Sequence, residues 1–194
     1  MKTLLIVRSS VNGAASFSNR LLEAWVAHAR QRLGEVRVVE RDLAAHPVPL
    51  LTPETVAAIR AGVVDTPARI EADRLARELV AELQAADEIA LGLPRYNFQA
   101  PAGFKAYIDT IARPRITFRY GESGPEGLLT DKPTYALMAS GGLYPAESDH
   151  YVPWLRQVLG FLGLKDLRVI QAQGVAMDAE GALARATAAI NATT

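Results

Sequence analysis

Short apolar runs alternate with segments of helical periodicity along the whole chain. Residues 4–7 and 89–93 are continuous apolar runs, which is typical of strands buried on both faces. Residues 135–139 and 167–172 repeat the pattern, and residues 35–41 alternate between polar and apolar positions. We therefore expect five strands, and the first lies at the start of the chain.

Segments with apolar residues at helical spacing lie between these runs. The first helix should include Leu21 to Leu33, with Ser18 or Asn19 as its N-cap and Gly34 as its stop. Further helices are expected after Thr52-Pro53, from Ile70 to Ala86, around Phe104 to Ile111, from Pro153 to Leu162 and from Ala179 to Ile190. Three glycines and a proline between Gly121 and Gly127 predict a loop or a hairpin tip.

This alternation predicts an α/β fold, with a parallel sheet covered by helices on both faces and right-handed crossovers. Five strands favour the flavodoxin-like order 2-1-3-4-5, in which ligands bind beyond the carboxyl ends of strands 1 and 3. The chain shows neither repeats nor a linker, so we expect a single domain over residues 1–194.

Composition narrows the possible functions. Apolar residues make up 49% of the 194 residues, which excludes a disordered chain. A formal net charge of zero gives no global field to attract nucleic acid or an anionic membrane. No apolar run reaches membrane-spanning length, and the first one is too short for a signal peptide. The absence of cysteine excludes disulfides, thiolate metal sites and thiol nucleophiles, and it fits a reducing, cytoplasmic location.

The loop after the first strand is a candidate phosphate site. Ser10, Ser16 and Ser18 offer hydroxyl groups, and the start of the following helix offers free backbone N–H groups. The loop lacks both the Gly-Lys-Ser/Thr ending of a P-loop and the G-x-G-x-x-G of a dinucleotide fold, which favours a mononucleotide. The alternative is an ordinary polar loop with a capping serine.

The third strand stops at Pro94 and continues into Arg95-Tyr96-Asn97-Phe98. Backbone N–H groups and the Asn97 amide could bond the edge of a heteroaromatic ring, while Tyr96 or Phe98 packs beside it. The alternative is a strand-to-helix turn with its aromatic residues tucked into the core.

Ala139-Ser140-Gly141-Gly142 follows the fourth strand, and its paired glycines allow close approach of a ligand. A hydrolase that uses Ser140, His150 and Asp149 is a competing hypothesis, although Met138 departs from the G-x-S-x-G pattern. A plain turn is the third alternative.

Other polar residues indicate no further site. The three histidines, His28, His46 and His150, lack the spacing of metal ligands, so we expect no metal centre. Arg113, Arg115 and Arg119 are expected to form a solvated rim or to pair with Glu122 and Glu126.

Several motifs together resemble one enzyme family. These are Arg8-Ser9-Ser10, Ser16-Phe17-Ser18-Asn19, Arg41-Asp42-Leu43-Ala44, Pro94 with Tyr96-Asn97-Phe98, Thr117-Phe118-Arg119-Tyr120, Gly124-Pro125-Glu126-Gly127-Leu128, Gly141-Gly142 and Phe161-Leu162-Gly163. The chain resembles the FMN-dependent NADH:quinone oxidoreductases, also called FMN-dependent NADH azoreductases, nearly from end to end.

The resemblance implies a tightly but non-covalently bound FMN that carries the redox chemistry. It implies electron transfer from NADH or NADPH to quinones or azo compounds in a ping-pong sequence, in a homodimer with sites at the subunit interface. Ser10, Ser16, Phe17 and Ser18 would hold the phosphate and ribityl end. Pro94, Arg95, Tyr96, Asn97, Phe98, Ala139, Ser140, Gly141 and Gly142 would contact the ring, and Tyr120 and Phe161 are candidate substrate contacts.

Two positions depart from the family pattern. Arg95 stands where many relatives have an apolar residue, often Met, and Ala139-Ser140 stands where relatives often have Ser-Arg. One hypothesis is that Arg95 places a cation beside the flavin, raises its potential and attracts anionic substrates. A flavodoxin-type electron carrier is the alternative function, but such carriers are usually strongly acidic, and this chain is neutral.

Overall fold

A five-stranded parallel sheet forms the centre of the computed structural model, which describes residues 1–194. Its strands are β1 (Lys2–Arg8), β2 (Val36–Asp42), β3 (Glu88–Pro94), β6 (Thr134–Ser140) and β7 (Leu167–Gln173). They lie in the order β2-β1-β3-β6-β7, and every neighbouring pair is parallel. The expected 2-1-3-4-5 order and the flavodoxin-like fold are therefore confirmed.

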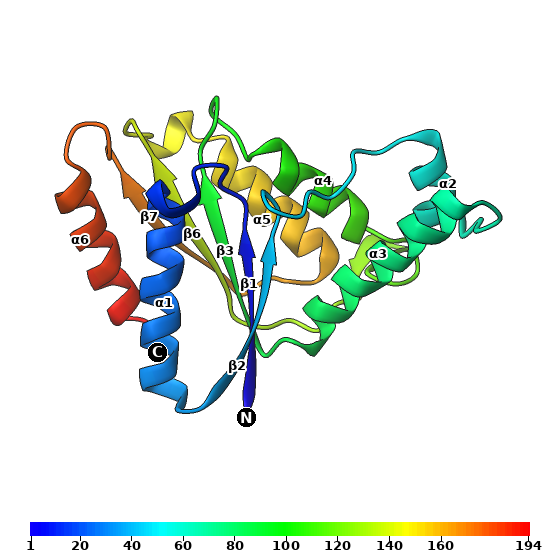
Figure 1. Ribbon diagram of the computed structural model, residues 1–194, viewed down its shortest axis with the longest axis horizontal. Coiled ribbons are helices and arrows are strands. Elements are labelled where there is room, and N and C mark those ends of the chain that lie inside the picture. Colours follow the sequence, from blue (N-terminus) through cyan, green and yellow to red (C-terminus); the bar gives the residue numbers. More distant parts are fainter.

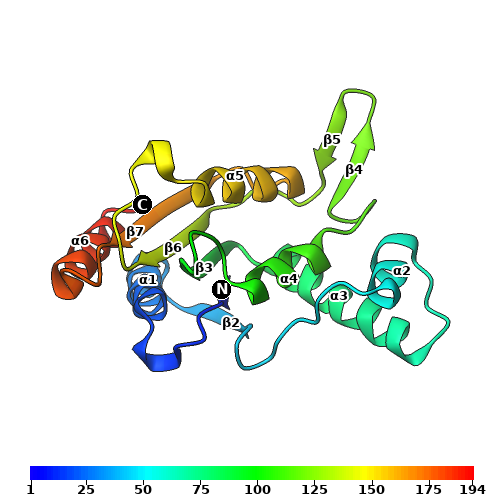
Figure 2. The ribbon, with the colours of Figure 1, turned by 90° about the horizontal axis from the view of Figure 1, so that it is seen from above.

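Helices cover both faces of this sheet (Figure 1). They are α1 (Phe17–Leu33), α2 (Pro53–Ala61), α3 (Pro67–Ala85), α4 (Ala102–Ile111), α5 (Tyr151–Leu162) and α6 (Ala179–Asn191), with short 3-10 turns η1 (Gly13–Ala15) and η2 (Ala146–Ser148). Figure 2 shows α1 and α6 on one face and α3, α4 and α5 on the other. Because all five strands are parallel, their carboxyl ends all lie at the same edge of the sheet.

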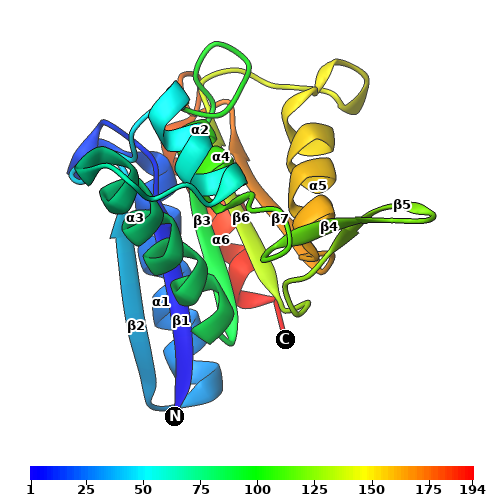
Figure 3. The ribbon, with the colours of Figure 1, turned by 90° about the vertical axis from the view of Figure 1, so that its right-hand side faces the viewer.

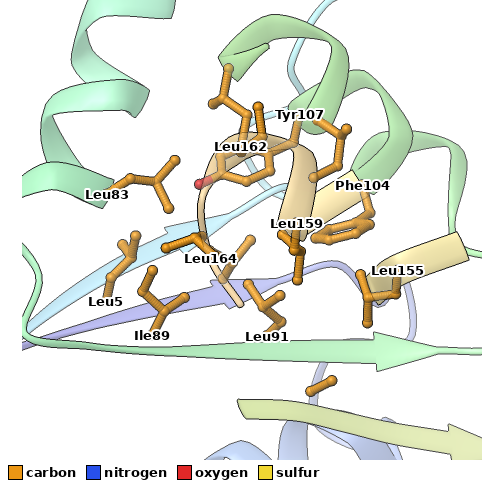
Figure 4. Close-up of a cluster of buried hydrophobic side chains, with 14 of the residues drawn as sticks. Leu5, Leu83, Ile89, Leu91, Phe104, Tyr107, Leu155, Leu159, Leu162 and Leu164 are labelled. Carbon is orange, nitrogen blue, oxygen red and sulfur yellow. The ribbon is translucent and has the colours of Figure 1, made fainter. Parts of the chain in front are cut away.

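Each face has its own hydrophobic core. The core beneath α3, α4 and α5 includes Leu83, Phe104 and Leu159, which converge on the β1 and β3 side chains (Figure 4). Trp154 packs against this core, whereas Trp25 is fully buried in the core beneath α1 and α6. Burying one such large apolar side chain contributes about 1.5–3 kcal/mol, so both faces anchor the sheet firmly.

A β-hairpin projects from the body between α4 and β6 (Figure 3). It consists of β4 (Phe118–Gly121) and β5 (Gly124–Gly127), as the glycine-rich sequence predicts. At its base the Phe118 ring lies 4.4 Å from the Phe161 ring, centroid to centroid. Gly127 lies against the backbone of Gly163, where a Cβ would come within 2.5 Å of the Gly163 Cα. Close backbone packing therefore fixes the base of the hairpin against the end of α5.

The start of α1 differs from the sequence prediction. Its N-cap is Ser16, neither Ser18 nor Asn19, and the Ser16 hydroxyl accepts the Asn19 N–H at 3.3 Å. All three residue types are good caps, so local preference alone does not select among them. The turn η1 brings the chain to Ser16 in an extended conformation, and this sets the first helical residue at Phe17. Gly34 ends the helix as predicted.

The prediction for Arg113 was wrong. Its side chain is only 4% exposed and bonds the Asp73 carboxylate on α3 at 2.6 Å, so it does not belong to a solvated rim. Arg119 does pair with Glu126, across the hairpin, at 2.7 Å. None of the helices combines the length and the hydropathy that crossing a membrane requires.

Candidate functional site

A cleft of about 210 Å³ opens at the carboxyl edge of the sheet, above β1, β3 and β6. Its lining comes from the loops that follow these strands and from the loop after β7. The lining residues are Ser10, Asn12, Ser16, Phe17, Ser18, Pro94, Arg95, Tyr96, Ala139, Ser140, Gly141 and Val175. The three segments singled out in the sequence therefore meet in one place.

One end of the cleft is suited to an anion. The Ser16 and Ser18 hydroxyls are buried and lie 3.0 Å apart at the start of α1. Ser16 satisfies the Asn19 N–H, which leaves the N–H groups of Phe17 and Ser18 without a protein acceptor. A helix N-terminus with free N–H groups and adjacent hydroxyls binds phosphate without a cation.

Serine hydroxyls after β1 form hydrogen bonds with the end of β3 and with the segment that follows it. Ser9 donates to the Gly92 carbonyl at 2.6 Å, and Ser10 bonds the Tyr96 hydroxyl at 3.1 Å. The Asn12 N–H in turn donates to the Ser10 hydroxyl. These contacts tie the anion-binding end of the cleft to the aromatic segment after β3.

That aromatic segment is a tight two-residue turn. Tyr96 and Gln99 exchange two backbone hydrogen bonds of 3.0 Å each, and between them Asn97 and Phe98 have φ values of 47° and 71°. Two successive positive φ values are typical of a type I′ turn, in which Asn-Gly is common. The Phe98 side chain is 69% exposed, so the aromatic residue of this turn is not tucked into the core.

The opposite wall is the turn after β6. Ser140 donates its hydroxyl to the Gly142 carbonyl at 2.9 Å, and the Ser140 and Gly141 carbonyls accept N–H groups of Val175 and Ala176. Gly141 and Gly142 are exposed, so their backbone is open to a ligand. The Ser140 hydroxyl is occupied by its own turn.

Asp149 bonds Arg95, and the hydrolase hypothesis is therefore wrong. Arg95 Nη2 donates to Asp149 Oδ1 at 2.9 Å, and the two side chains are only 3% and 7% exposed. Burial alone would raise the pKa of Asp149, but hydrogen bonds from Arg95 and from the Tyr151 and Val152 N–H groups hold it below its usual value. The carboxylate stays ionised and is not aligned to orient an imidazole.

The same pair changes the hypothesis about Arg95. A free cation beside the ring would need an uncompensated guanidinium, but this one is neutralised by Asp149 and lies 4.0 Å over the Tyr144 ring. The Arg95 backbone N–H is also used, because it donates to the Ala139 carbonyl at 2.8 Å. Arg95 lines the cleft, but its charge is already compensated within the protein.

The two candidate substrate contacts lie away from this cleft. Tyr120 is on the hairpin and is 77% exposed, while Phe161 is near the end of α5, ten residues beyond Tyr151. Neither lines the cleft within one chain. Phe161 instead borders a separate apolar depression, which also includes Pro125, Trp154 and Val158.

Two residues that line the cleft, Asn12 and Val175, were not assigned a role from the sequence. Asp149 was considered only for a hydrolase, and in the structure it holds Arg95 in place. For Val175 the available signal was topological, because the loop after the last strand must open on the same edge as the others. His28 contacts the Thr193 carbonyl, and no cluster of three or more candidate metal ligands occurs.

Comparison with known proteins agrees with this geometry. A family model described as flavodoxin-like fold matches residues 1–193. The FMN-dependent NADH:quinone oxidoreductase of Yersinia pestis is 42% identical over 182 residues, which cover 93% of this chain and 90% of the relative. The enzyme of that name from Herminiimonas arsenicoxydans is 42% identical and covers 98% of each chain.

Among solved structures, an azoreductase from Bacillus anthracis superposes with a TM-score of 0.85 at 27% identity, over 100% of both chains. The similarity therefore extends through every element that builds the cleft. The chain is an enzyme that belongs to the family of FMN-dependent NADH:quinone oxidoreductases, within the flavodoxin-like fold.

Proposed function

We propose that the domain formed by residues 1–194 binds FMN in the cleft and transfers two electrons from NADH, or NADPH, to quinones. The same site would reductively cleave aromatic azo compounds, and donor and acceptor would occupy it in turn, in a ping-pong sequence. The relatives' names support the cofactor and the quinone substrate, and the similar azoreductase supports the azo substrate. Because NADH is the donor, we place this reaction in the cytoplasm.

One observation carries the proposal. The N-terminus of α1, with its free N–H groups and buried hydroxyls, lies on one side of a single cleft. The residues that follow the neighbouring strands β3 and β6 lie on the other side. This fits the two chemically different ends of FMN, a phosphate monoester and a flat ring with polar edges. Bound there, FMN would supply the two-electron chemistry that no side chain of the protein can perform.

The residues of the cleft would divide the work of holding it. Ser16, Ser18 and the N–H groups at the start of α1 would bind the phosphate, with Ser10 near the ribityl chain. The exposed N–H groups of the turn at Asn97 and Phe98 donate to no protein acceptor and would bond the ring edge. Gly141 and Gly142 would allow the ring to approach the opposite wall closely.

We further propose a homodimer in which each cleft lies at the subunit interface. The apolar depression of about 540 Å³ beside Pro125, Trp154 and Phe161 lies on the outer side of α5 and would be covered by a second copy. The projecting hairpin would then bring Tyr120 towards the partner's cleft. This accounts for why neither candidate substrate contact reaches the cleft of its own chain.

A visible spectrum of the purified protein tests the proposed function. We expect a yellow protein with flavin absorbance that bleaches on anaerobic addition of NADH and recovers when a quinone is added. Initial rates at several fixed acceptor concentrations should give parallel double-reciprocal lines, as a ping-pong sequence requires. Failure to bind added FMN would overturn the proposal.

The flavodoxin-type carrier is distinguished in the same experiment. Such a carrier would be yellow but would not be bleached by NADH alone, because it accepts electrons from a protein partner. Rapid bleaching by NADH without any added protein would exclude it.

A further inference from the structure

The Arg95 side chain contacts both the turn after β3 and the segment from Tyr144 to Tyr151. Its Nη2 donates to Asp149 at 2.9 Å, its Nη1 donates to the Phe98 carbonyl at 3.3 Å, and its guanidinium stacks over Tyr144 at 4.0 Å and lies 5.4 Å from the Tyr151 ring. A planar guanidinium suits this combination, because its N–H groups point outward in its own plane and leave its flat face free to stack on an aromatic ring. One side chain therefore links the turn after β3 to the segment before α5.

The turn that Arg95 holds is conformationally costly. Asn97 tolerates a positive φ better than most residues, but Phe98 at 71° does not. A residue in such a conformation is strained and persists only where its surroundings enforce it. Arg95 fixes the Phe98 carbonyl, and Tyr144 meets the Phe98 ring edge-on at 6.1 Å between centroids.

The other end of the link is equally well anchored. Asp149 Oδ1 accepts the N–H groups of Tyr151 at 2.9 Å and Val152 at 3.3 Å, so the carboxylate lies at the N-terminus of α5. A negative charge is stabilised there by the helix dipole. The Arg95–Asp149 pair is therefore fixed to α5, a helix that packs in the core.

From these contacts we propose that Arg95 is a positioning residue. The Arg95–Asp149 pair holds the Tyr96–Gln99 turn in its strained conformation and so shapes in advance the wall against which the flavin ring packs. The pair acts through geometry and contributes little net charge, because the guanidinium and the carboxylate neutralise each other. This inference rests on the proposed function, because that proposal places the flavin ring against this wall. The conformational order of the turn can nevertheless be measured without flavin.

The first test uses the apoprotein and hydrogen exchange. R95M and D149N should each speed exchange of the Tyr96 and Gln99 N–H groups, which close the turn, by about tenfold or more. R74M, which removes an exposed arginine paired with Glu71 and Glu78 on α3, is the matched control and should change neither amide. In D149N the amide oxygen still accepts the α5 N–H groups, but the charge-assisted hydrogen bond from Arg95 is weakened to a bond with a neutral acceptor, so this variant tests the pair even if R95M does not fold.

The second test uses flavin binding and potential. R95M and D149N should weaken the binding of FMN and of riboflavin by the same factor. The turn that loses its order contacts the flavin ring, which both ligands have, and not the phosphate, which only FMN has. The two-electron potential should move by less than about 30 mV, which corresponds to tenfold in the equilibrium constant, in the double variant R95M/D149N, because this variant removes both charges of the pair together. R95K, which keeps the charge but not the planar fork, should resemble R95M.

Unchanged amide exchange in both variants would overturn the positioning role. So would a two-electron potential that shifts by more than about 30 mV in the double variant R95M/D149N, because removal of a neutral pair leaves the net charge beside the flavin unchanged. If the wild-type protein binds no flavin, the proposed function fails, but the exchange comparison still decides whether the pair holds the turn.

Discussion

The Asp73–Arg113 ion pair shows how far a buried charge depends on one partner. Arg113 follows α4, its side chain is 4% exposed, and its Nε and Nη1 atoms have no hydrogen-bond partner. Asp73 on α3 also bonds Arg77, whose side chain is largely exposed. The two arginines therefore share one carboxylate but differ in their access to water.

D73A should destabilise the protein by about 3–5 kcal/mol, because it leaves the Arg113 guanidinium buried without a counter-charge. R77A removes the exposed partner and should cost only about 0–1 kcal/mol, since water screens that pair. Urea unfolding measures both values. Equal losses in the two variants would show that burial of Arg113 is not what makes the pair important.

Acid should weaken the fold partly through the same carboxylate. Burial alone would raise the pKa of Asp73, but hydrogen bonds from Arg77 and Arg113 outweigh it and hold the pKa below the ordinary value of 3.8. A lowered pKa in the folded state stabilises the protein above the unfolded pKa, and that contribution is lost as pH falls through the folded value.

The free energy of unfolding of the wild type should therefore decrease below about pH 5, and D73N should lack the part due to Asp73. Urea titrations at a series of pH values check this. E71Q, which alters an exposed carboxylate on the same helix, should stay closer to the wild-type profile because solvent screens its pairing with Arg74. A D73N profile as steep as that of the wild type would contradict the assignment.

At the level of secondary-structure elements, α1 has two roles that can be separated by mutation. Its N-cap Ser16 stabilises the helix and lies at the anion-binding end of the cleft, whereas Thr66 caps α3 by accepting the Arg69 N–H at 3.3 Å, outside the cleft. Each cap should contribute about 1 kcal/mol.

S16A and T66A should therefore lose similar stability, but only S16A should weaken FMN binding. The affinity for riboflavin, which lacks the phosphate, should be unchanged in both variants. Flavin fluorescence titrations distinguish these outcomes. A parallel loss of riboflavin affinity in S16A would place the phosphate elsewhere.

The hairpin β4–β5 depends on a glycine contact at its base. G127A would place a Cβ against the Gly163 backbone, which cannot move as a flexible side chain does, and should destabilise the protein by about 1–3 kcal/mol. G121A in the same hairpin meets its nearest atom at 3.6 Å and is the control with little expected effect. Thermal unfolding compares the two, and equal melting temperatures would refute the tight contact.

Much of the element level could be read from the sequence. The apolar runs of β1, β3 and β6 predict central strands, and α2 does begin after Thr52, with Pro53 as its first residue. The start of α1 could not be predicted, because three neighbouring residues cap equally well and η1, which decides among them, carries no strong signal. Local patterns place elements, but competition between similar local options is settled by the chain that precedes them.

Long-range polar contacts were beyond such patterns. The partners of Arg95 and Arg113 lie 54 and 40 residues away in the sequence, on elements whose relative placement only the folded chain defines. The segments that form the cleft could be predicted, since parallel strands deliver their loops to one edge. The compensation of the Arg95 charge, and the position of Tyr120 and Phe161 outside the cleft, could not.

At the scale of the whole molecule, the proposed dimer predicts that a charge on the exposed face of α5 prevents dimerisation. V158R places a charge in the apolar depression on α5, and sedimentation velocity should show a monomer in place of a dimer. A184R introduces the same side chain at an exposed position of α6, on the opposite face of the sheet, and should remain dimeric. Dissociation of both variants, or of neither, would count against an interface on α5.

The division of the interior into two cores places one optical reporter on each side of the sheet. The chain has only two tryptophans, and Trp25 lies in the α1–α6 core while Trp154 packs on the α3–α4–α5 core. Replacing either with Phe leaves a single emission band that follows one half of the interior during denaturation. Coincident unfolding curves would show that the sheet couples the two halves into one cooperative unit.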